Sequence, residues 1–368
     1  MNKQWLGVAL ACMSVWNMSA ESPVSEKASG YTLVWSDEFN GSSLDRDSWN
    51  VEINGTGCGN AELQYYLDKP TNVCVRDGNL VITARKEKYQ DKNFTSGRIN
   101  TMNKVCFTYG VVEARIKLPK TANGLWPAFW MMGNDISTVS WPRCGETDIL
   151  EMGHSNGIKD GVTDRLFNGA LHWGVASSEH RILTGDHVSY YSLQDGEYHI
   201  FRVVWTPNEI AMLLDDNKEP YMRVDISDRS SEDGVGYYFH KDNFLLLNMA
   251  VGGNFPGIHD AEGITALPQG SARQRVVCCF IGEAGEASGM EALSSSPNRP
   301  QPQGGRFEIE TTKEASMRYT YVRQHDTTDC AAACLAMVCL HYKKEITITR
   351  LRDMMGTDLK GTNLTGME

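Results

Sequence analysis

The chain has 368 residues, of which 41% are hydrophobic and 22% are charged, so it is long enough to bury a sizeable core. Its formal net charge is −11 at pH 7. This negative charge argues against nucleic acid and against an anionic membrane surface as partners.

The N-terminus is predicted to be an export signal over residues 1–20. A short positive region precedes residues 4–16, which are mostly apolar but form too short a run to favour a membrane-spanning helix. Cleavage after Ala20 fits this interpretation, although Met18 stands where a small residue is preferred. Lipid attachment at Cys12 is the alternative. We therefore expect a bacterial protein that is secreted, periplasmic or located at the cell surface.

The following segment is predicted to consist of short strands rather than helices. Its β-branched and aromatic runs are separated by turn residues such as Gly252-Gly253-Asn254, and helix-period runs are scarce before residue 325. The pattern predicts a mainly β chain, with a β-sandwich over residues 28–281 in which one concave sheet forms a substrate cleft. The clearest runs are 31–35, 79–85, 111–118 and 199–205.

The cysteines of this segment leave two interpretations open. They could form disulfides in an exported protein, or they could be free buried thiols. No C-x-x-C pattern indicates a zinc site. The four residues are Cys58, Cys74, Cys106 and Cys144.

Residues 146–151 (ETDILE) are the most informative stretch, because they read as a strand that carries three carboxylates. Side chains alternate along a strand, so Glu146 and Asp148 share one face and Glu151 points to the other. A β-bulge between Asp148 and Glu151 would bring all three to the same side. Crowding would then keep one carboxyl protonated and leave another ionised, as retaining glycoside hydrolysis requires. An acidic surface strand is the alternative.

The aromatic residues around this stretch favour a carbohydrate site. Trp126 and Trp130 lie upstream in GLWPAFWMM, and Trp141 lies in WPRCG. Aromatic rings stack on the apolar faces of sugars, while carboxylates and amides bind the hydroxyls. Burial in the core is the alternative for some of these tryptophans.

Residues 31–270 resemble the laminarinase (endo-β-1,3-glucanase) type of glycoside hydrolase family 16. The stretch 146–151 matches the bulged E-x-D-x-x-E signature of that family. Further matching pieces follow the order and spacing of the family. They are WSDEF (35–39), NAELQYY (60–66), SGRI (96–99), YGVVEARIK (109–117), LHWG (171–174), WTP (205–207) and NMAVGGN (248–254).

The resemblance implies a concanavalin-like jelly roll and an endo-acting, retaining hydrolase of β-1,3 or mixed β-1,3-1,4 glucans. Glu146 would be the nucleophile, Glu151 the general acid/base, and Asp148 the residue that tunes them. We expect a monomer whose partner is a β-glucan polysaccharide; a red-algal galactan is an alternative substrate, and a non-catalytic glucan-binding protein is an alternative function. The candidate substrate-binding residues are Asn60, Glu62, Arg98, Trp126, Trp130, Trp141 and His172.

No cofactor is expected for catalysis. The resemblance implies a structural calcium held in part at Glu38 and Gly78. However, the segment after Gly270 departs from the closing strand of the family and lacks the acidic residue that completes the site. An apolar strand can still form over residues 276–281, but the residues present fit a calcium site only in part.

The C-terminal part of the chain follows neither pattern. Residues 282–316, rich in Gly, Ser and Pro, are predicted to be a disordered linker. Residues 317–368 resemble the start of a C39 cysteine peptidase domain of peptide exporters, with Cys330 at the nucleophile position and Gln324 at the oxyanion position. The catalytic His and Asp of that family have no counterpart here, so we predict a truncated, inactive helical fragment. A fusion of two gene fragments, through a frameshift or an assembly error, would explain this organisation.

Overall fold

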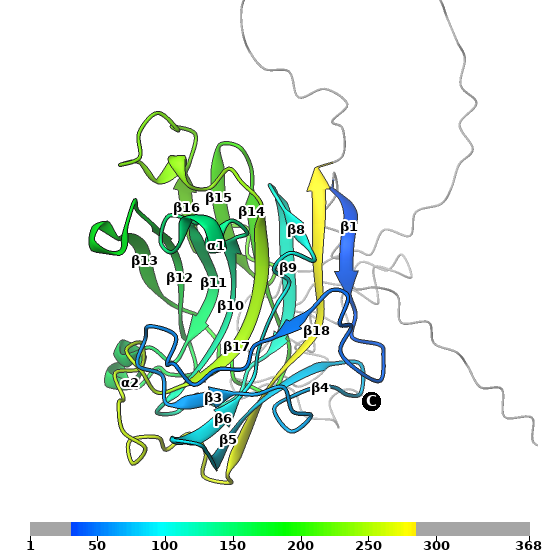
Figure 1. The fold of residues 1–368 in the computed structure, drawn as a ribbon, viewed down its shortest axis with the longest axis vertical. Helices are drawn as coiled ribbons and strands as arrows, with labels where there is room; N and C mark the ends of the chain where they lie inside the picture. The colour runs from blue at the N-terminus through cyan, green and yellow to red at the C-terminus, as the bar shows by residue number, and fades with distance from the viewer. Residues whose placement is uncertain (1–30, 285–368) are drawn as a thin grey trace, which may run out of the picture. The chain divides into compact units, whose positions relative to one another are not determined.

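Two largely antiparallel β-sheets, packed face to face, form the part of the chain that the computed structural model describes, residues 31–284 (Figure 1). The first sheet has ten strands in the order β16-β15-β14-β9-β18-β5-β6-β3, with β1 paired to β18 and β4 to β5. Its strands are β1 (Tyr31–Asp37), β3 (Gln64–Tyr66), β4 (Val73–Val75), β5 (Leu80–Tyr89), β6 (Lys92–Ser96), β9 (Gly110–Lys117), β14 (His199–Trp205), β15 (Glu209–Leu214), β16 (Met222–Asp225) and β18 (Ser271–Ala284).

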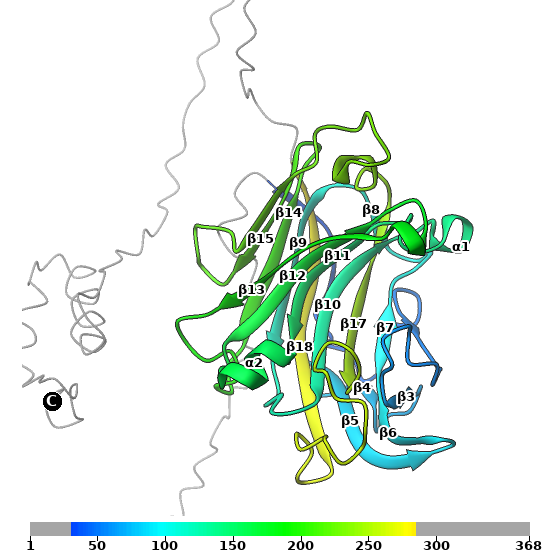
Figure 2. The ribbon, with the colours of Figure 1, turned by 90° about the vertical axis from the view of Figure 1, so that its left-hand side faces the viewer.

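The second sheet has eight strands in the order β13-β12-β11-β10-β17-β7-β2, with β8 paired to β17. Figure 2 shows β10, β11 and β12 side by side in this sheet. Its strands are β2 (Asn50–Val51), β7 (Arg98–Asn100), β8 (Cys106–Phe107), β10 (Leu125–Gly133), β11 (Glu146–Met152), β12 (Leu166–Trp173), β13 (Arg181–Val188) and β17 (Asn243–Val251).

Helices are short in the described residues. They are α1 (Ile136–Val139), α2 (Ser155–Asp160), η2 (Ser177–Glu179) and η3 (Val235–Tyr237), and no helix there is long and apolar enough to cross a membrane. The predicted β-sandwich and its four clearest strands are thus confirmed, with β-branched and aromatic residues in each.

The core lies between the two sheets because alternate residues of each strand point inward. In β5 the fully buried residues include Leu80 and Ile82, and in β10 they include Phe129. The strands β10 and β17 are buried at every position, so side chains cover their other face as well. That other face carries Trp130, together with a second, smaller apolar cluster.

The segment that departs from the family pattern forms β18, which lies between β5 and β9 in the ten-stranded sheet. Val276 is fully buried and pairs with Leu80 on one side and Ile116 on the other. A bulge follows, between Val276 and Cys278. The strand predicted over residues 276–281 therefore forms, within a longer strand, and the sandwich closes.

Several predictions from the sequence fall on residues that the structure does not describe. These are the export signal at 1–20, almost all of the linker at 282–316, and the fragment at 317–368 with Gln324 and Cys330. The chain divides into one unit that ends at Glu291 and a second, Ala292–Glu368, and the described residues all belong to the first.

The disulfides considered for Cys58, Cys74, Cys106 and Cys144 do not form, because all four thiols are free. Cys144 is fully buried, and burial raises the pKa of its thiol to about 12. The alternative interpretation, free buried thiols, is therefore confirmed in full for Cys144, whereas the free thiols of Cys58, Cys74 and Cys106 are only partly buried.

Gln274 is an unusual residue for the core position that it occupies. It pairs with Ile82, so the two side chains share the inward face, and it is fully buried. Neither its Oε1 nor its Nε2 has a hydrogen-bond partner among the described residues. Burial of an unpaired amide costs about 1–3 kcal/mol in protein mutational data.

We therefore expect Gln274→Met to increase the free energy of unfolding by about 1–3 kcal/mol, because the thioether fills the space without an unpaired polar group. Urea denaturation would measure the change. Gln194→Met is the matched control: Gln194 is buried too, but its amide bonds to Thr121 and Thr163, so its replacement should destabilise the protein. A loss of stability in the Gln274 variant would contradict the prediction.

Candidate active site

The three carboxylates of β11 lie on one face because the strand carries a bulge. Glu146 pairs with His172 and Asp148 with Ala170, but Glu151 pairs with Asn168, so two residues of β11 stand opposite one residue of β12. The bulge lies between Asp148 and Glu151, as the sequence predicts. We call this side of the eight-stranded sheet, with Glu146, Asp148 and Glu151, the carboxylate face.

The residues inside the bulge confirm this orientation. Ile149 and Leu150 are both fully buried and belong to the main core between the sheets. Asp148 and Glu151, on the carboxylate face, retain 4% and 9% exposure. One extra residue therefore reverses the facing of Glu151 without moving an acidic side chain into the core.

Two of the carboxylates accept a hydrogen bond from an indole, and the third lies beside an imidazole. The Trp141 indole donates from Nε1 to Glu146 Oε2 over 2.9 Å, and the Trp126 indole donates from Nε1 to Glu151 Oε1 over 3.0 Å. His172 Nε2 lies 3.3 Å from Asp148 Oδ2 and 3.9 Å from Glu146 Oε1. Two tryptophans and a histidine that the sequence indicated as sugar contacts thus also touch the acids directly.

Burial raises the pKa of all three carboxyls, and the repulsion between their charges adds to the effect for Glu146 and Glu151. The pKa of Glu146 rises to about 8, as does that of Asp148. The pKa of Glu151 is raised well above its usual range. At neutral pH the cluster therefore holds protons that exposed carboxylates would have lost.

Glu146 and Glu151 differ in the groups that oppose this rise. The charges of His172 and Arg98 lower the pKa of Glu146, and so does the hydrogen bond from Trp141. The pKa of Glu151 is raised by burial and by two neighbouring carboxylates, and it is lowered by His172 and one indole bond. The charge of Arg98 is among the main causes that lower the pKa of Glu146, but not among those for Glu151.

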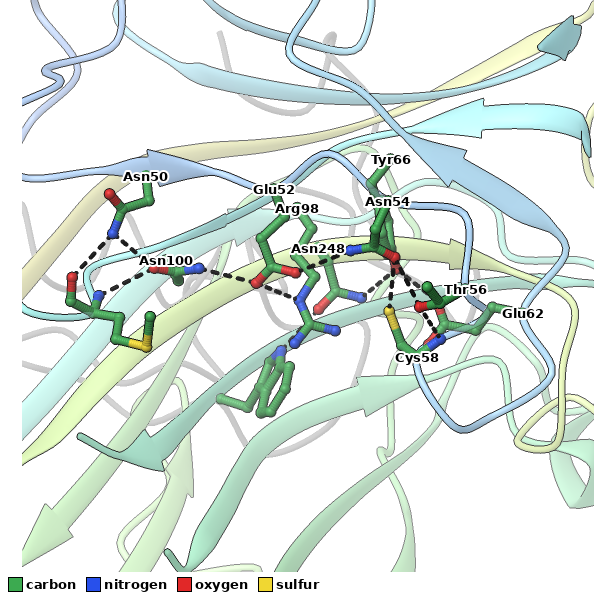
Figure 3. A network of polar contacts seen from close by, with 12 residues as sticks. Asn50, Glu52, Asn54, Thr56, Cys58, Glu62, Tyr66, Arg98, Asn100 and Asn248 are labelled. Atoms are coloured by element: carbon green, nitrogen blue, oxygen red, sulfur yellow. Dashed lines mark hydrogen bonds and ion pairs between the residues drawn. The ribbon is translucent and has the colours of Figure 1, made fainter. Parts of the chain in front are cut away.

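Beyond β10 and β17, a polar network holds Arg98 on the carboxylate face (Figure 3). Glu52 Oε1 accepts hydrogen bonds from Arg98 Nε and from Asn100 Nδ2, both over 2.9 Å. The Arg98 guanidinium lies over the Trp130 ring at 4.8 Å, and Trp130 Nε1 donates to Asn248 Oδ1 over 2.8 Å. The ion pair and the ring contact fix the guanidinium beside the indole.

Aromatic groups flank both ends of the acid row. At the Glu151 end, Phe255 stacks on Trp126 with ring centroids 4.8 Å apart. At the Glu146 end, His180 lies 4.6 Å from the Trp141 ring, and its Nε2 is 2.8 Å from Nδ1 of His172. The sequence singled out neither Phe255 nor His180. Phe255 directly follows the matched NMAVGGN piece, which could have pointed to it.

Two predicted substrate contacts have different surroundings. Glu62 is 3% exposed, and its Oε2 accepts hydrogen bonds from Gln64 Nε2 and the Tyr66 hydroxyl. Asn60 is exposed in the loop before it, and its backbone carbonyl accepts a hydrogen bond from the Asn254 amide. Glu62 therefore has a structural role in this loop, while the side chain of Asn60 is free to face solvent. Their contacts with a substrate stay predictions.

Among the described residues, one group of three acidic or histidine side chains could hold a metal ion, and it is Glu146, Asp148 and His172. Glu38 does not belong to such a group, and burial and the neighbouring Asp37 raise the pKa of its carboxyl. Gly78 lies in the turn before β5, and residues 271–282, which include most of β18, contain no acid. The residues present do not complete the calcium site that the family pattern implied.

Two family models match parts of the chain. The model for the beta-glucan synthesis-associated protein SKN1/KRE6/Sbg1 matches residues 17–138. The model for the peptidase C39 family matches residues 318–368, which agrees with the resemblance found in the tail.

Relatives match the part of the chain that forms the sandwich. A glucan endo-1,3-beta-glucosidase of Cryptopygus antarcticus is 38% identical over 238 residues, which are 62% of this chain and 83% of the relative. Glucan endo-1,3-beta-glucosidase A1 of Niallia circulans is 33% identical over 66% of this chain, and the match spans only 37% of that longer relative.

A solved structure of similar fold is a glycoside hydrolase family 16 endo-glucanase from Bacteroides ovatus in complex with G4G3G-2F-DNP. It is 36% identical to this chain, with a TM-score of 0.59, and the match covers 67% of this chain and 98% of the other.

The raised pKa of Glu151 predicts a protonated carboxyl that persists at neutral pH. Infrared difference spectroscopy should detect its C=O stretch beside those of Glu146 and Asp148, whose pKa values rise to about 8, and Glu151→Gln should remove one component of this absorption. The control Glu209→Gln changes a carboxylate on β15 of the other sheet, paired with Arg223, and should leave every component in place. An absorption that Glu151→Gln does not change would contradict the assignment of a proton to Glu151.

Proposed function

Since the chain belongs to glycoside hydrolase family 16, in its laminarinase type, we propose that it is an endo-acting, retaining hydrolase of β-1,3 or mixed β-1,3-1,4 glucans. The observation that carries the proposal is the bulge of β11, which sets Glu146, Asp148 and Glu151 on one face beside tryptophan donors. Two carboxyl groups on one face, one of which ionises before the other, are what double displacement requires.

In the first step, Glu146 attacks the anomeric carbon of the sugar. The bond from that carbon to the glycosidic oxygen breaks, and the leaving oxygen takes the proton of Glu151. In the second step, the Glu151 carboxylate takes a proton from water, whose oxygen displaces Glu146 from the sugar. The hydrogen bonds from Trp141 and Trp126 orient the two carboxyls for these roles.

Asp148 links the protonation of Glu146 to that of Glu151. It lies between them on the same face, and its negative charge raises the pKa of both neighbours. His172 opposes this effect from β12, because a positive imidazole 3.3 Å from Asp148 favours ionised carboxylates. Asp148 and His172 thus act in opposite directions on the pKa values of the nucleophile Glu146 and the acid Glu151.

The sugar-binding surface extends from the acids toward β7. The Trp130 indole is buried and carries the Arg98 guanidinium over its ring, so this part of the surface offers the hydrogen-bond donors of Arg98 to the sugar. Glu52, which pairs with Arg98 and accepts a hydrogen bond from Asn100, supplies a further polar group for hydroxyls. Trp126 and Phe255 form a second aromatic surface at the Glu151 end.

A non-catalytic glucan-binding protein is the alternative that shares this scaffold. The presence of all three acids on one face, with raised pKa values and an indole donor at both Glu146 and Glu151, favours the enzyme. The proposal includes export by residues 1–20 to a secreted, periplasmic or cell-surface location and activity as a monomer, without a catalytic metal.

Glu146→Gln is expected to lower the rate of reducing-sugar release from laminarin by at least about 1,000-fold, because the amide cannot attack the anomeric carbon. Circular dichroism would check that the fold is intact. The control Glu87→Gln, on β5 of the other sheet, should keep the activity of the parent. Activity in the Glu146 variant would rule out its role as nucleophile, and inactivity of the parent on laminarin and mixed-linkage glucan would rule out the substrate class.

The pH dependence of kcat/KM should also report the cluster. The nucleophile must be ionised, so activity falls on the acidic side as Glu146 gains its proton. Because the pKa of Glu146 is raised, this fall lies above the pH at which an ordinary carboxyl titrates. His172 lowers the pKa of Glu146, so His172→Gln should move the acidic limb to higher pH, whereas the exposed control His259→Gln should not. A shift to lower pH would contradict the sign.

A further inference from the structure

The bulge that reverses Glu151 leaves backbone groups without a partner in the sheet. On the β10 side, Leu150 pairs with Phe129 and Asp148 with Trp130, so Ile149 has no partner there. On the β12 side, Ile149 and Leu150 lie within the register shift. A buried carbonyl at such a position needs another hydrogen-bond donor.

That donor comes from the other sheet. The Tyr221 hydroxyl donates a hydrogen bond to the backbone carbonyl of Ile149. Tyr221 directly precedes β16, and its own amide donates to the Met212 carbonyl of β15 over 2.9 Å. The phenol therefore connects the edge of the ten-stranded sheet to the bulge under the acids.

The surroundings of Tyr221 fix the position of its ring. The ring packs edge to face on Phe167, with centroids 4.9 Å apart, and lies 5.2 Å from the His187 ring. Gly169 stands opposite the bulge, and a Cβ added there would lie 3.0 Å from Tyr221 Cε2 and 2.9 Å from Met212 Sδ. The ring thus occupies the space that a side chain at residue 169 would need.

The Tyr221 hydroxyl keeps the proton that it donates at the pH of the reaction. Burial raises the pKa of Tyr221 above its usual range, so the phenol stays protonated. A backbone carbonyl can only accept. The bond to Ile149 therefore persists while the carboxylates above it gain and lose protons.

Resting on the function proposed above, we propose that Tyr221 is a positioning residue for the acid/base Glu151. Its hydroxyl fixes the carbonyl of Ile149 and so holds the backbone of the bulge between Asp148 and Glu151. The position of this backbone determines where the Glu151 carboxyl lies relative to the glycosidic oxygen. A displacement of about 1 Å in a reacting group can cost about 100-fold in rate. Tyr221 does not touch the substrate itself.

The test uses two substrates that differ in their need for an acid. Laminarin has a leaving oxygen that must take the proton of Glu151, whereas 2,4-dinitrophenyl β-laminaribioside releases a stable phenolate without one. In Tyr221→Phe, kcat/KM on laminarin should fall about 30-fold, while kcat/KM on the dinitrophenyl glycoside, which reports the first step, should stay within about twofold. KM for laminarin should change little, because the sugar contacts remain.

Tyr198→Phe is the matched control. It also removes a phenolic hydroxyl that donates a hydrogen bond, in this case to Asn79 Oδ1, just before β14 and away from the bulge. It should change kcat/KM on neither substrate by more than about twofold. The double variant Glu151→Gln/Tyr221→Phe should be no slower on laminarin than Glu151→Gln alone, since Tyr221 acts through Glu151.

Equal losses on both substrates, or none on laminarin, would overturn the positioning role. A parent chain that cleaves neither substrate would instead overturn the proposed function. If Tyr221→Phe does not fold, Gly169→Ala provides the second test, because its methyl group pushes against the Tyr221 ring. The same selective loss on laminarin is expected, and an unselective loss would count against the proposal.

Discussion

The β-bulge in β11 is the constraint on which the site depends, because a strand alternates its side chains and cannot otherwise place Glu146, Asp148 and Glu151 on one face. The added residue, Ile149, has its side chain in the core and its carbonyl bound by Tyr221. The sheet thus retains its apolar inner face while its outer face gathers three acids. The same bulge therefore contributes Ile149 to the core between the sheets and orients the acids on the outer face.

Desolvation and local donors together set the protonation of the acids. Burial alone would favour the neutral form of every carboxyl. The indoles of Trp141 and Trp126 and the imidazole of His172 oppose it to different extents at the two ends of the row. The tryptophans therefore have a second task besides any stacking on sugars: their N–H groups hold a carboxylate in place where water is scarce. Neither task excludes the other, because the ring faces and the ring nitrogen are different parts of the side chain.

The sequence predicted what depends on local pattern. Alternation and turn residues indicate the strands, and the spacing of the acids indicates the bulge. It could not predict contacts made across the fold: Glu52 reaches Arg98 from the position just after β2, Phe255 reaches Trp126 from the loop after β17, and Tyr221 crosses from the other sheet. No local signal marks such partners, because they are set by the packing of distant segments. The free thiols and the pairing of β18 with three strands also depend on where the sheets bring the chain, not on composition.

The position of β18 has a consequence for the way the protein is made. This strand is the last in the described chain, yet it lies between β5 and β9 and also pairs with β1. Until the ribosome has released it, the growing chain holds three strands with open edges, and such edges pair readily with other chains. Most of the sheet must therefore wait for its final strand, and the pairing of β1 with β18 joins the two ends of the described segment only after synthesis passes Ala284. Folding of this sandwich is therefore completed late in synthesis, and a partner that shields open strand edges would matter most in the interval before β18 is made.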